Sequence, residues 1–354
     1  MYNKVFFICN YAAKYGGNFL TSFRFLSNKL ANNNIKIYFV FPIEAKKQNW
    51  EVDLSHFNVL YSKFDEKNIA NIINSCLEER DSVIIHLNFV SSLYLIKLKN
   101  QINTKASFVF QQHMAVNFGI KQIIKGLILR TFAPQKTAYI GVSPEVYKDV
   151  KREVGIRKSY LIINAIDTRR LEPFHTIDNS NILIFGTDFK RKGVDLAIRA
   201  ILHSKIKNKC KLIVVTHNKK DACDLIVNEF GVIPSFVRIA SPVQDVRKLY
   251  NNSFLFLSPS RLEAFGYAVV EAAYSGVSVI ASDVLGQNTL STIPGVRMVP
   301  AEDVSSLRRE INNAFDHKDD NREKINKCAR QYIDAHFSLE SWANKILKVY
   351  GQFK

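Results

Sequence analysis

Short apolar segments alternate with amphipathic segments along almost the whole chain. In the first half, the apolar runs predict buried strands at 5–9, 35–41, 82–87, 106–111 and 138–142. Helical spacing predicts helices at 18–31, 68–79 and 118–130. The second half repeats the scheme, with strands at 182–185, 211–216, 236–239, 254–257 and 278–281 and helices at 193–202, 219–230, 243–250, 265–275 and 304–315. This alternation is typical of doubly wound parallel sheets, and there are enough strands for two.

The segment 164–181 has no clear period and contains Pro173 within a polar surrounding, which indicates a boundary. We expect an N-terminal Rossmann-like domain over 1–165, a linker over 166–180 and a C-terminal Rossmann-like domain over 181–336. An amphipathic helix over 337–354 should pack back toward the first domain. Two such domains would face a central cleft, and ligands of parallel sheets bind beyond the carboxyl ends of the strands. Candidate chemistry should therefore lie in the loops that follow strands.

Composition narrows the class of protein. The chain has 354 residues, of which 47% are hydrophobic, as expected for a folded protein. Its five cysteines are scattered and lack metal-ligand spacing, so we expect neither a disulfide framework nor a zinc site. The start of the chain reads as a strand rather than a signal peptide, and no apolar run is long enough to span a bilayer. We therefore expect a cytoplasmic protein.

The formal net charge of +17 predicts attraction to something anionic. No acidic residue lies between Asp81 and Glu145, a window that is also rich in Ile, Leu and Phe. This combination fits an anionic membrane surface better than nucleic acid, and we expect no nucleic-acid partner. The segment 117–130 has its apolar residues on one helical face beside Lys121 and Lys125. Two interpretations stay open for it: a helix lying on the inner face of the cell membrane, or an ordinary helix facing the core.

The strongest local signal is Ser258-Pro-Ser-Arg-Leu-Glu263-Ala-Phe265-Gly266, followed by Glu271 in a predicted helix. Glu263 falls in the loop between a strand and this helix, so it should face the ligand. Gly266 allows close backbone approach at the helix start, where N–H groups and the helix dipole favour an anion such as a diphosphate. The alternative is that both glutamates are ordinary surface residues of a helix.

A second signal is the basic loop Gly186-Thr187-Asp-Phe-Lys-Arg191-Lys192-Gly193, which follows the first strand of the second half. Clustered cations between glycines suit a diphosphate, although a solvated basic turn would look the same. In the first half, Gly16 and Gly17 follow the first strand and permit close approach of a phosphate or sugar. His113 ends a buried strand and should face the cleft, but a lone His is often structural. For His86, a role in the site and a structural place in the core are equally open interpretations.

These motifs together resemble the retaining GT-B glycosyltransferases that carry a Glu-x7-Glu motif (glycosyltransferase family 4, glycosyl transferases group 1). The spacing of Glu263 and Glu271, the Phe-Gly between them and the segment 275–283 carry the resemblance, which is strong over 182–286 and weak before Ser107. It implies the GT-B fold and assigns Glu263 to the donor hexose and Glu271 to the ribose diol. One departure is Thr187, where the family usually has Arg.

By this resemblance the catalytic candidates are Glu263, His113, Arg191 and Lys192. The donor-binding candidates are Gly16, Gly17, Gly186, Phe265, Gly266 and Glu271. No metal or other cofactor is expected, because side chains and a helix end would neutralise the leaving diphosphate.

The resemblance thus implies a retaining, metal-independent hexosyltransferase. Its donor would be a nucleotide-diphosphate sugar, with UDP-sugars favoured by family habit. Its acceptor would be a glycan or lipid-linked glycan of bacterial-type surface polysaccharide synthesis, such as lipopolysaccharide or exopolysaccharide. Two alternatives stay open: a catalytically silent GT-B partner that binds an acceptor or a second transferase, and a nucleotide-sugar epimerase. A hydride-transferring Rossmann enzyme is disfavoured because no Gly-x-Gly-x-x-Gly follows a strand.

Overall fold

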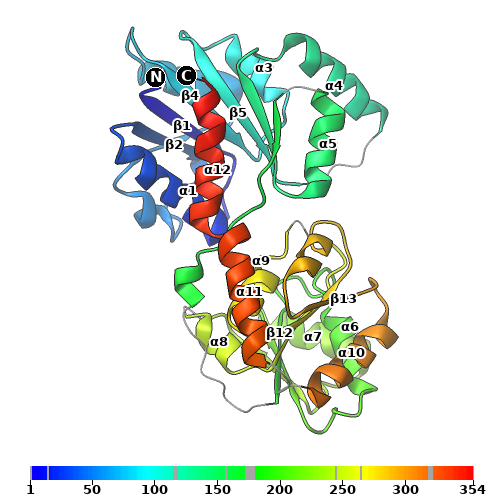
Figure 1. Ribbon diagram of the computed structural model, residues 1–354. Helices are drawn as coiled ribbons and strands as arrows, with labels where there is room; N and C mark the ends of the chain where they lie inside the picture. The colour runs from blue at the N-terminus through cyan, green and yellow to red at the C-terminus, as the bar shows by residue number, and fades with distance from the viewer. Residues whose placement is uncertain are drawn as a thin grey trace. The chain divides into compact units, whose positions relative to one another are not determined.

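The computed structural model describes residues 2–13, 16–114, 119–155, 158–171, 180–243, 245–263, 265–317 and 322–353. The chain forms two compact units, one of residues 1–165 with 339–354 and one of residues 166–338. In each unit a single sheet is covered by helices on both faces (Figure 1). Both ends of the chain belong to the first unit, because the C-terminal helix returns to it.

The first unit contains a parallel sheet whose order, among the described residues, is β3-β2-β1-β4-β5-β6-β7. Its strands are Lys4–Cys9 (β1), Lys36–Pro42 (β2), Asn58–Ser62 (β3), Val83–Asn88 (β4), Ala106–Gln112 (β5), Thr137–Gly141 (β6) and Ser159–Leu161 (β7). The central strand β1 is buried along its whole length, as its continuous apolar sequence predicts. The chain winds outward from it in both directions, which puts a switch point between β1 and β4.

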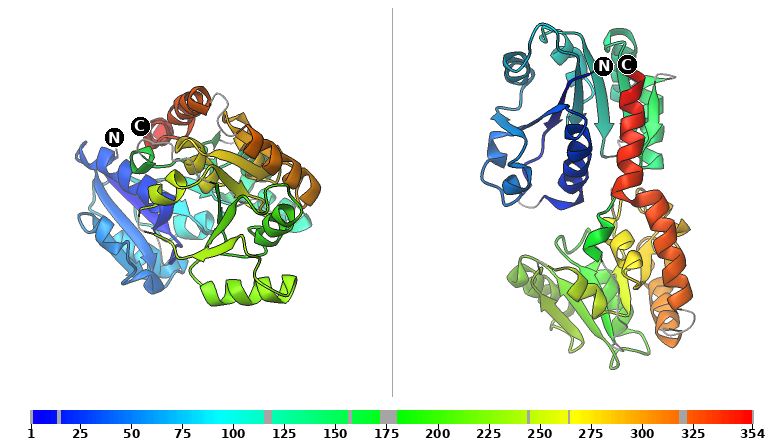
Figure 2. Two further views of the ribbon diagram at one scale, coloured as in Figure 1. Left: turned by 90° about the horizontal axis from the view of Figure 1, so that it is seen from below. Right: turned by 60° about the vertical axis from the view of Figure 1, so that its left-hand side comes forward.

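Helices cover both faces of this sheet because successive strand residues point to opposite sides. Phe7 and its neighbours share a core with α1 (Gly17–Ala31) and α12 (Leu339–Tyr350), which lie on one face (Figure 2). Phe6 belongs to a second core on the other face, with α2 (Glu66–Ser75), α3 (Tyr94–Lys99) and α5 (Pro144–Val154). Helix α4 (Ile120–Phe132) packs against α5. Short 3-10 turns occupy Ile43–Ala45, Glu51–Leu54 and Gly351–Phe353.

The second unit repeats this architecture with the parallel order β10-β9-β8-β11-β12-β13. Its strands are Asn181–Phe185 (β8), Lys211–Val215 (β9), Val237–Ala240 (β10), Leu255–Ser258 (β11), Ser278–Ser282 (β12) and Val296–Val299 (β13). The switch point lies between β8 and β11. These adjacent strands are followed by the two loops that hold the candidate residues of this unit.

One face of the second sheet packs on α6 (Val194–Leu202), α7 (Lys219–Phe230) and α10 (Val304–Asp316). The other face carries α8 (Arg247–Asn251), α9 (Tyr267–Tyr274) and α11 (Arg322–Phe337). Further 3-10 turns lie at Thr168–Leu171 and Asn288–Thr292. The expectation of two doubly wound parallel sheets is therefore confirmed.

Several elements escaped the sequence pattern, namely β3, α3, α5, β7, β13 and α11. Strand β7 has only three residues, and β3 is an edge strand that is half exposed, so neither shows a continuous apolar run. Helix α11 buries few large apolar residues besides Ile333 and Phe337, which leaves its periodicity weak. Residues 172–179 of the predicted linker and 117–118 of the segment 117–130 lie outside the described residues.

Candidate active site

Two loops of the second unit lie side by side at the carboxyl edge of its sheet. Residues 186–193 connect β8 to α6, and residues 259–266 connect β11 to α9. Because β8 and β11 are hydrogen-bonded neighbours that run parallel, both loops leave the same edge. Gly193 marks their contact: it has a φ of +68°, and a Cβ atom built on it would lie 2.0 Å from the carbonyl oxygen of Pro259. Only glycine allows this approach.

The contact between the loops brings Lys192 to Glu263. The Lys192 ammonium is ion-paired with the Glu263 carboxylate, and Arg191 Nη1 lies 3.7 Å from the same oxygen. The hydroxyl of Ser260 donates to this oxygen at 3.3 Å. The Glu263 side chain is only 11% exposed, so the pairing is partly shielded from water. Two cations and one carboxylate thus meet at the edge of the sheet.

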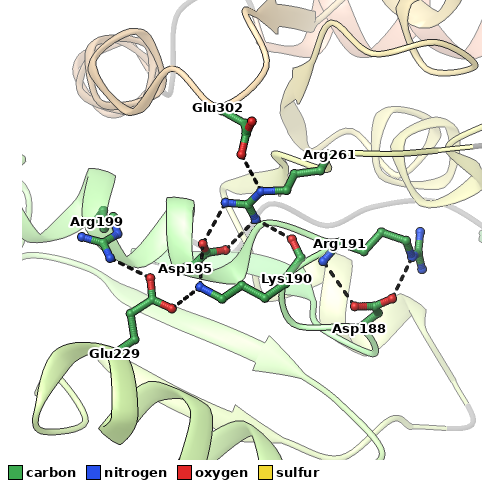
Figure 3. Close-up of polar contacts among 8 residues, drawn as sticks. All are labelled: Asp188, Lys190, Arg191, Asp195, Arg199, Glu229, Arg261 and Glu302. Atoms are coloured by element: carbon green, nitrogen blue, oxygen red, sulfur yellow. Dashed lines mark hydrogen bonds and ion pairs between the residues drawn. The ribbon is translucent and has the colours of Figure 1, made fainter.

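Arg191 is held in place by contacts with both loops. Its Nε donates to Asp188 Oδ2 at 3.0 Å and its Nη1 donates to the carbonyl oxygen of Leu262 at 3.2 Å. The backbone N–H of Arg191 also donates to Asp188 Oδ1 at 3.2 Å. These contacts fix the guanidinium between Asp188 and the backbone of the second loop, and Figure 3 shows the two contacts with Asp188.

Arg261 joins the second loop to the first loop and to α6. Its guanidinium donates to both oxygens of Asp195 at 2.9 Å and to Glu302 Oε1 at 2.7 Å (Figure 3). Its backbone N–H donates to the carbonyl oxygen of Arg191 at 2.8 Å, and its side chain also donates to that of Lys190. Burial alone would raise the pKa of Asp195, but the hydrogen bonds from Arg261 and Lys190 outweigh it and lower this pKa.

Lys190 points away from the Lys192–Glu263 pair although it belongs to the same basic run. Its ammonium lies 3.2 Å from Asp195 Oδ2 and is also ion-paired with Glu229 on α7. Arg199 Nη2 lies 2.7 Å from the other oxygen of Glu229. The three consecutive cations therefore divide: Lys190 stabilises the loop, whereas Arg191 and Lys192 lie near Glu263.

Gly266 forms the start of α9. Its φ of +90° is left-handed, and a Cβ atom there would meet Leu290 at 3.0 Å and Gln287 at 3.3 Å. The side chain of Phe265 is buried and packs on Tyr267 and Phe337, at ring distances of 4.9 and 5.9 Å. The Phe265 ring therefore does not line the site, and only its backbone can serve a ligand. Gly186 lies at the end of β8 between Val194 and Val214.

Glu271 lies on α9, one turn beyond its start, and is 8% exposed. Its Oε2 accepts a hydrogen bond from the hydroxyl of Tyr250 at 3.1 Å. Burial raises the pKa of Tyr250 well above 10, and the nearby Glu271 charge adds to this shift. Tyr250 therefore stays protonated and anchors the carboxylate as a donor.

The first unit holds the remaining candidates at the carboxyl edge of its own sheet. Gly16 packs closely on Trp50, and Gly17 opens α1 with a left-handed φ of +54°. His113 follows β5, and its ring stacks on Phe89 at 4.0 Å and contacts Phe19 of α1 at 5.4 Å. The glycine loop and His113 are thus connected through an aromatic cluster.

The protonation state of His113 follows from its surroundings. Burial lowers its pKa to about 3, so the ring is neutral near pH 7. Its Nε2 lies 3.0 Å from Asn88 Oδ1, while the Asn88 amide nitrogen faces the carbonyl oxygen of His86. Nε2 therefore carries the hydrogen, and Nδ1 keeps its lone pair as an acceptor.

His86 has a structural place. It is fully buried, with Nδ1 2.7 Å from the hydroxyl of Tyr350 on α12 and Nε2 3.1 Å from Gln111 Oε1. Burial lowers its pKa to about 3, with the proximity of His113 contributing. The core interpretation of His86 is therefore the correct one.

Sequence reasoning did not single out Arg261, Asp195, Tyr250 or Gln287. Gln287 is fully buried and donates to the carbonyl oxygens of Ser258 and Ser282 at 3.0 Å each, which ties the ends of β11 and β12 beneath Gly266. The available signals were local: Arg261 precedes Glu263 in the same loop, and Asp195 is the acidic residue of the first turn of α6. Within the described residues, no group of three or more His, Cys, Asp or Glu could hold a metal ion, and no helix is long and apolar enough to cross a membrane.

The two sheets, their strand orders and the two loops of the second unit define a GT-B architecture. The Anabaena protein Alr3699/HepE, solved with UDP and glucose, has the same fold, with a TM-score of 0.76, 14% sequence identity and coverage of 99% of this chain and 100% of that chain. At this level of identity the likeness establishes the fold alone.

The match to a family model lies within the second unit. Residues 179–317 match the family model described as glycosyl transferases group 1. The lipopolysaccharide glucosyltransferase WaaG of Escherichia coli is 33% identical over 112 residues, which cover 31% of this chain and 30% of that protein. The capsular polysaccharide biosynthesis glycosyltransferase CapM of Staphylococcus aureus is 29% identical over 200 residues, or 52% of this chain and 51% of that protein. The matches thus span only 30% and 51% of the two curated relatives.

Proposed function

We propose that this protein is a retaining glycosyltransferase that transfers a hexose or N-acetylhexosamine from a nucleotide-diphosphate sugar, without a metal ion. The observation that carries the proposal is the meeting of Lys192 and Arg191 with Glu263. A diphosphate bound by the two cations would lie beside a carboxylate that can reach the attached sugar. The match of residues 179–317 to glycosyl transferases group 1 supports this assignment.

The nucleotide would bind along α9. The N-terminus of α9 at Gly266 would attract the phosphates through the positive end of the helix dipole, and Glu271 offers a carboxylate to the ribose hydroxyls. UDP-sugars are favoured because HepE, which shares the fold, was solved with UDP and glucose. In the first unit, Gly16, Gly17 and the neutral His113 would contact the donor sugar and the glycan that receives it. Nδ1 of His113 would act there as a hydrogen-bond acceptor.

In the proposed reaction the bond from the anomeric carbon to the diphosphate breaks, and the acceptor hydroxyl attacks that carbon from the same face. The proton of the hydroxyl goes to the departing phosphate. Lys192, Arg191 and the start of α9 stabilise the negative charge that develops on the diphosphate, and a single contact of this kind is worth about 3 kcal/mol. Glu263 orients the sugar and supports the positive charge on its ring.

We further propose that the acceptor is a glycan or lipid-linked glycan of a bacterial-type surface polysaccharide, and that the protein works in the cytoplasm at the inner face of the cell membrane. The curated relatives support the first part, since one is a lipopolysaccharide and the other a capsular polysaccharide glycosyltransferase.

The test is nucleoside diphosphate release from a panel of nucleotide sugars, with EDTA present, with isothermal titration of each donor in parallel. We expect release from one donor that EDTA leaves unchanged and that Glu263→Gln lowers by about a hundredfold or more. Glu310→Gln is the matched control, because Glu310 is paired with Arg297 away from the two loops. A requirement for divalent metal would contradict the metal-free reaction.

The two alternatives give different outcomes in the same assay. An epimerase would convert the donor to its epimer without net release of nucleoside diphosphate, which chromatography of the nucleotide sugars detects. A silent partner would bind no donor in the titration and release nothing. Retention is read from the anomeric configuration of the product by NMR.

A further inference from the structure

Helix α4 presents its apolar residues to solvent rather than to the core. Six large apolar side chains of this helix are exposed. Their exposed fractions are 77% for Ile120, 53% for Ile123, 53% for Ile124, 57% for Leu127, 37% for Ile128 and 60% for Phe132. Gly126 and Leu129 are its buried residues. Exposure of this much apolar surface on one helix marks an interaction site in a folded protein.

The opposite side of α4 shows why the apolar face is not needed for packing. Gly126 lies so close to α5 that a Cβ atom there would be 2.6 Å from the carbonyl oxygen of Glu153. Arg130 donates to the carbonyl oxygens of Glu153 and Arg152 at 3.2 and 2.7 Å, which caps the end of α5. Lys125 Nζ lies 2.6 Å from the buried carboxylate of Glu153. Polar side chains thus attach α4 to the unit, and the isoleucines and leucine point outward.

The charged residues around this apolar face indicate which kind of surface it would bind. Helix α4 has no acidic residue, Lys121 is exposed on it, and Lys136 is exposed four residues beyond its end. Neither lysine has a carboxylate partner within the part of the chain that the structure describes. Figure 1 shows α4 at the edge of the first unit, beside α5. A protruding apolar face with cations at its border fits the headgroup region of an anionic bilayer.

We infer that Ile120, Ile123, Ile124, Leu127, Ile128 and Phe132 form a membrane-docking face that inserts into an anionic lipid surface. A second copy of the chain would fit less well, because α4 offers no carboxylate to pair with Lys121 of its partner. The inference gives the proposed membrane location a defined surface, and it rests on the proposed function only for the reason why docking would be useful. Lipid binding itself does not require the transfer reaction.

The test is flotation of the full chain with vesicles of phosphatidylcholine alone and of equal parts phosphatidylcholine and phosphatidylglycerol. We expect the protein to float with the mixed vesicles and to stay unbound with the neutral ones. The double variant Ile123→Gln, Leu127→Gln should lose binding by tenfold or more, because two inserted side chains are replaced by polar ones. Lys121→Gln should weaken binding by about fivefold.

The control is Val52→Gln, which removes another exposed apolar residue of the first unit, 72% exposed, outside α4. It should float like the wild type. Circular dichroism checks that every variant is folded, which we expect because the replaced side chains are exposed. Equal flotation of wild type and double variant, or no preference for anionic vesicles, would overturn the inference. A dimer in sedimentation that the double variant dissociates, without lipid binding, would assign the face to a second copy instead.

Discussion

The guanidinium of Arg261 binds both carboxylate oxygens of Asp195 at 2.9 Å, and this contact joins the second loop to α6, the helix that directly follows the loop of Lys192. The Asp195 side chain is only 4% exposed, so its charge depends on partners. Arg261 also binds Glu302 and two backbone carbonyl oxygens of the basic loop. It is therefore a positioning residue for the candidate site rather than a group that touches the donor.

Replacing Arg261 should loosen the basic loop. Arg261→Met leaves Asp195 with Lys190 as its cation and should lower the free energy of unfolding of the second unit by about 2 kcal/mol. Arg261→Lys keeps a charge but loses the planar fork, and we expect about tenfold weaker UDP binding by isothermal titration. Arg247→Met is the matched control, because the Arg247–Asp245 pair has similar distances on the surface and should cost under about 1 kcal/mol. Equal effects of the two Met variants on stability and UDP affinity would contradict the positioning role.

Adjacent lysines of one loop should have different roles. Lys192→Met removes a cation that we assign to the diphosphate, and UDP affinity should fall by about tenfold or more. Lys190→Met removes a cation bound to Asp195 and Glu229, and it should lower stability while leaving most of the UDP affinity. Titration calorimetry and urea unfolding of both variants give the comparison. If Lys190→Met weakened UDP binding as much as Lys192→Met, the division of the basic run would be wrong.

The location of these loops could be predicted from sequence, whereas their internal pairing could not. The apolar runs of β8 and β11 are unambiguous, and any parallel sheet places the loops after them at one edge. Which of three successive cations faces Glu263 depends on local backbone direction, and the link between Arg261 and Asp195 joins residues 66 positions apart. Spacing in the sequence carries neither piece of information.

Helix α4 shows the same limit in another form. Its apolar spacing predicts a helix with one apolar face, and that helix is present. Whether this face turns to the core or to solvent depends on what the opposite side contacts. Gly126 and Leu129 provide that contact with α5 and the core, and a hydrophobic pattern alone gives them no greater weight than the isoleucines.

The buried histidines should make the first unit sensitive to acid. Burial lowers the pKa of both His86 and His113 to about 3, whereas an unfolded His titrates near about 6.5. The unfolded chain therefore binds more protons between these values, and stability falls as the pH drops below about 6.5, by about 1.4 kcal/mol per pH unit for each histidine. His86→Gln should lower the number of protons taken up on unfolding by about one, and the slope should fall accordingly.

Tryptophan fluorescence isolates this effect, because Trp50 and Trp342, the two tryptophans of the chain, both lie in the core of the first unit. Urea unfolding followed at pH 7.5 and at several values down to about pH 5 gives the slope. His203→Gln in the second unit is the control and should leave the fluorescence transition unchanged. A wild-type slope equal to that of His86→Gln would contradict the proton count.

Gly193 provides a direct test of the contact between the two loops. Gly193→Ala places a Cβ atom 2.0 Å from the carbonyl oxygen of Pro259 and strains a left-handed residue with a φ of +68°. Gly231→Ala meets the same kind of strain at a φ of +77° but has nothing within 4 Å of its Cβ atom. Both variants should lose about 1 kcal/mol from backbone strain. Only Gly193→Ala must also separate the loops, so it alone should lower nucleoside diphosphate release and UDP affinity. Equal activity of the two variants would show that the approach of Lys192 to Glu263 does not depend on this contact.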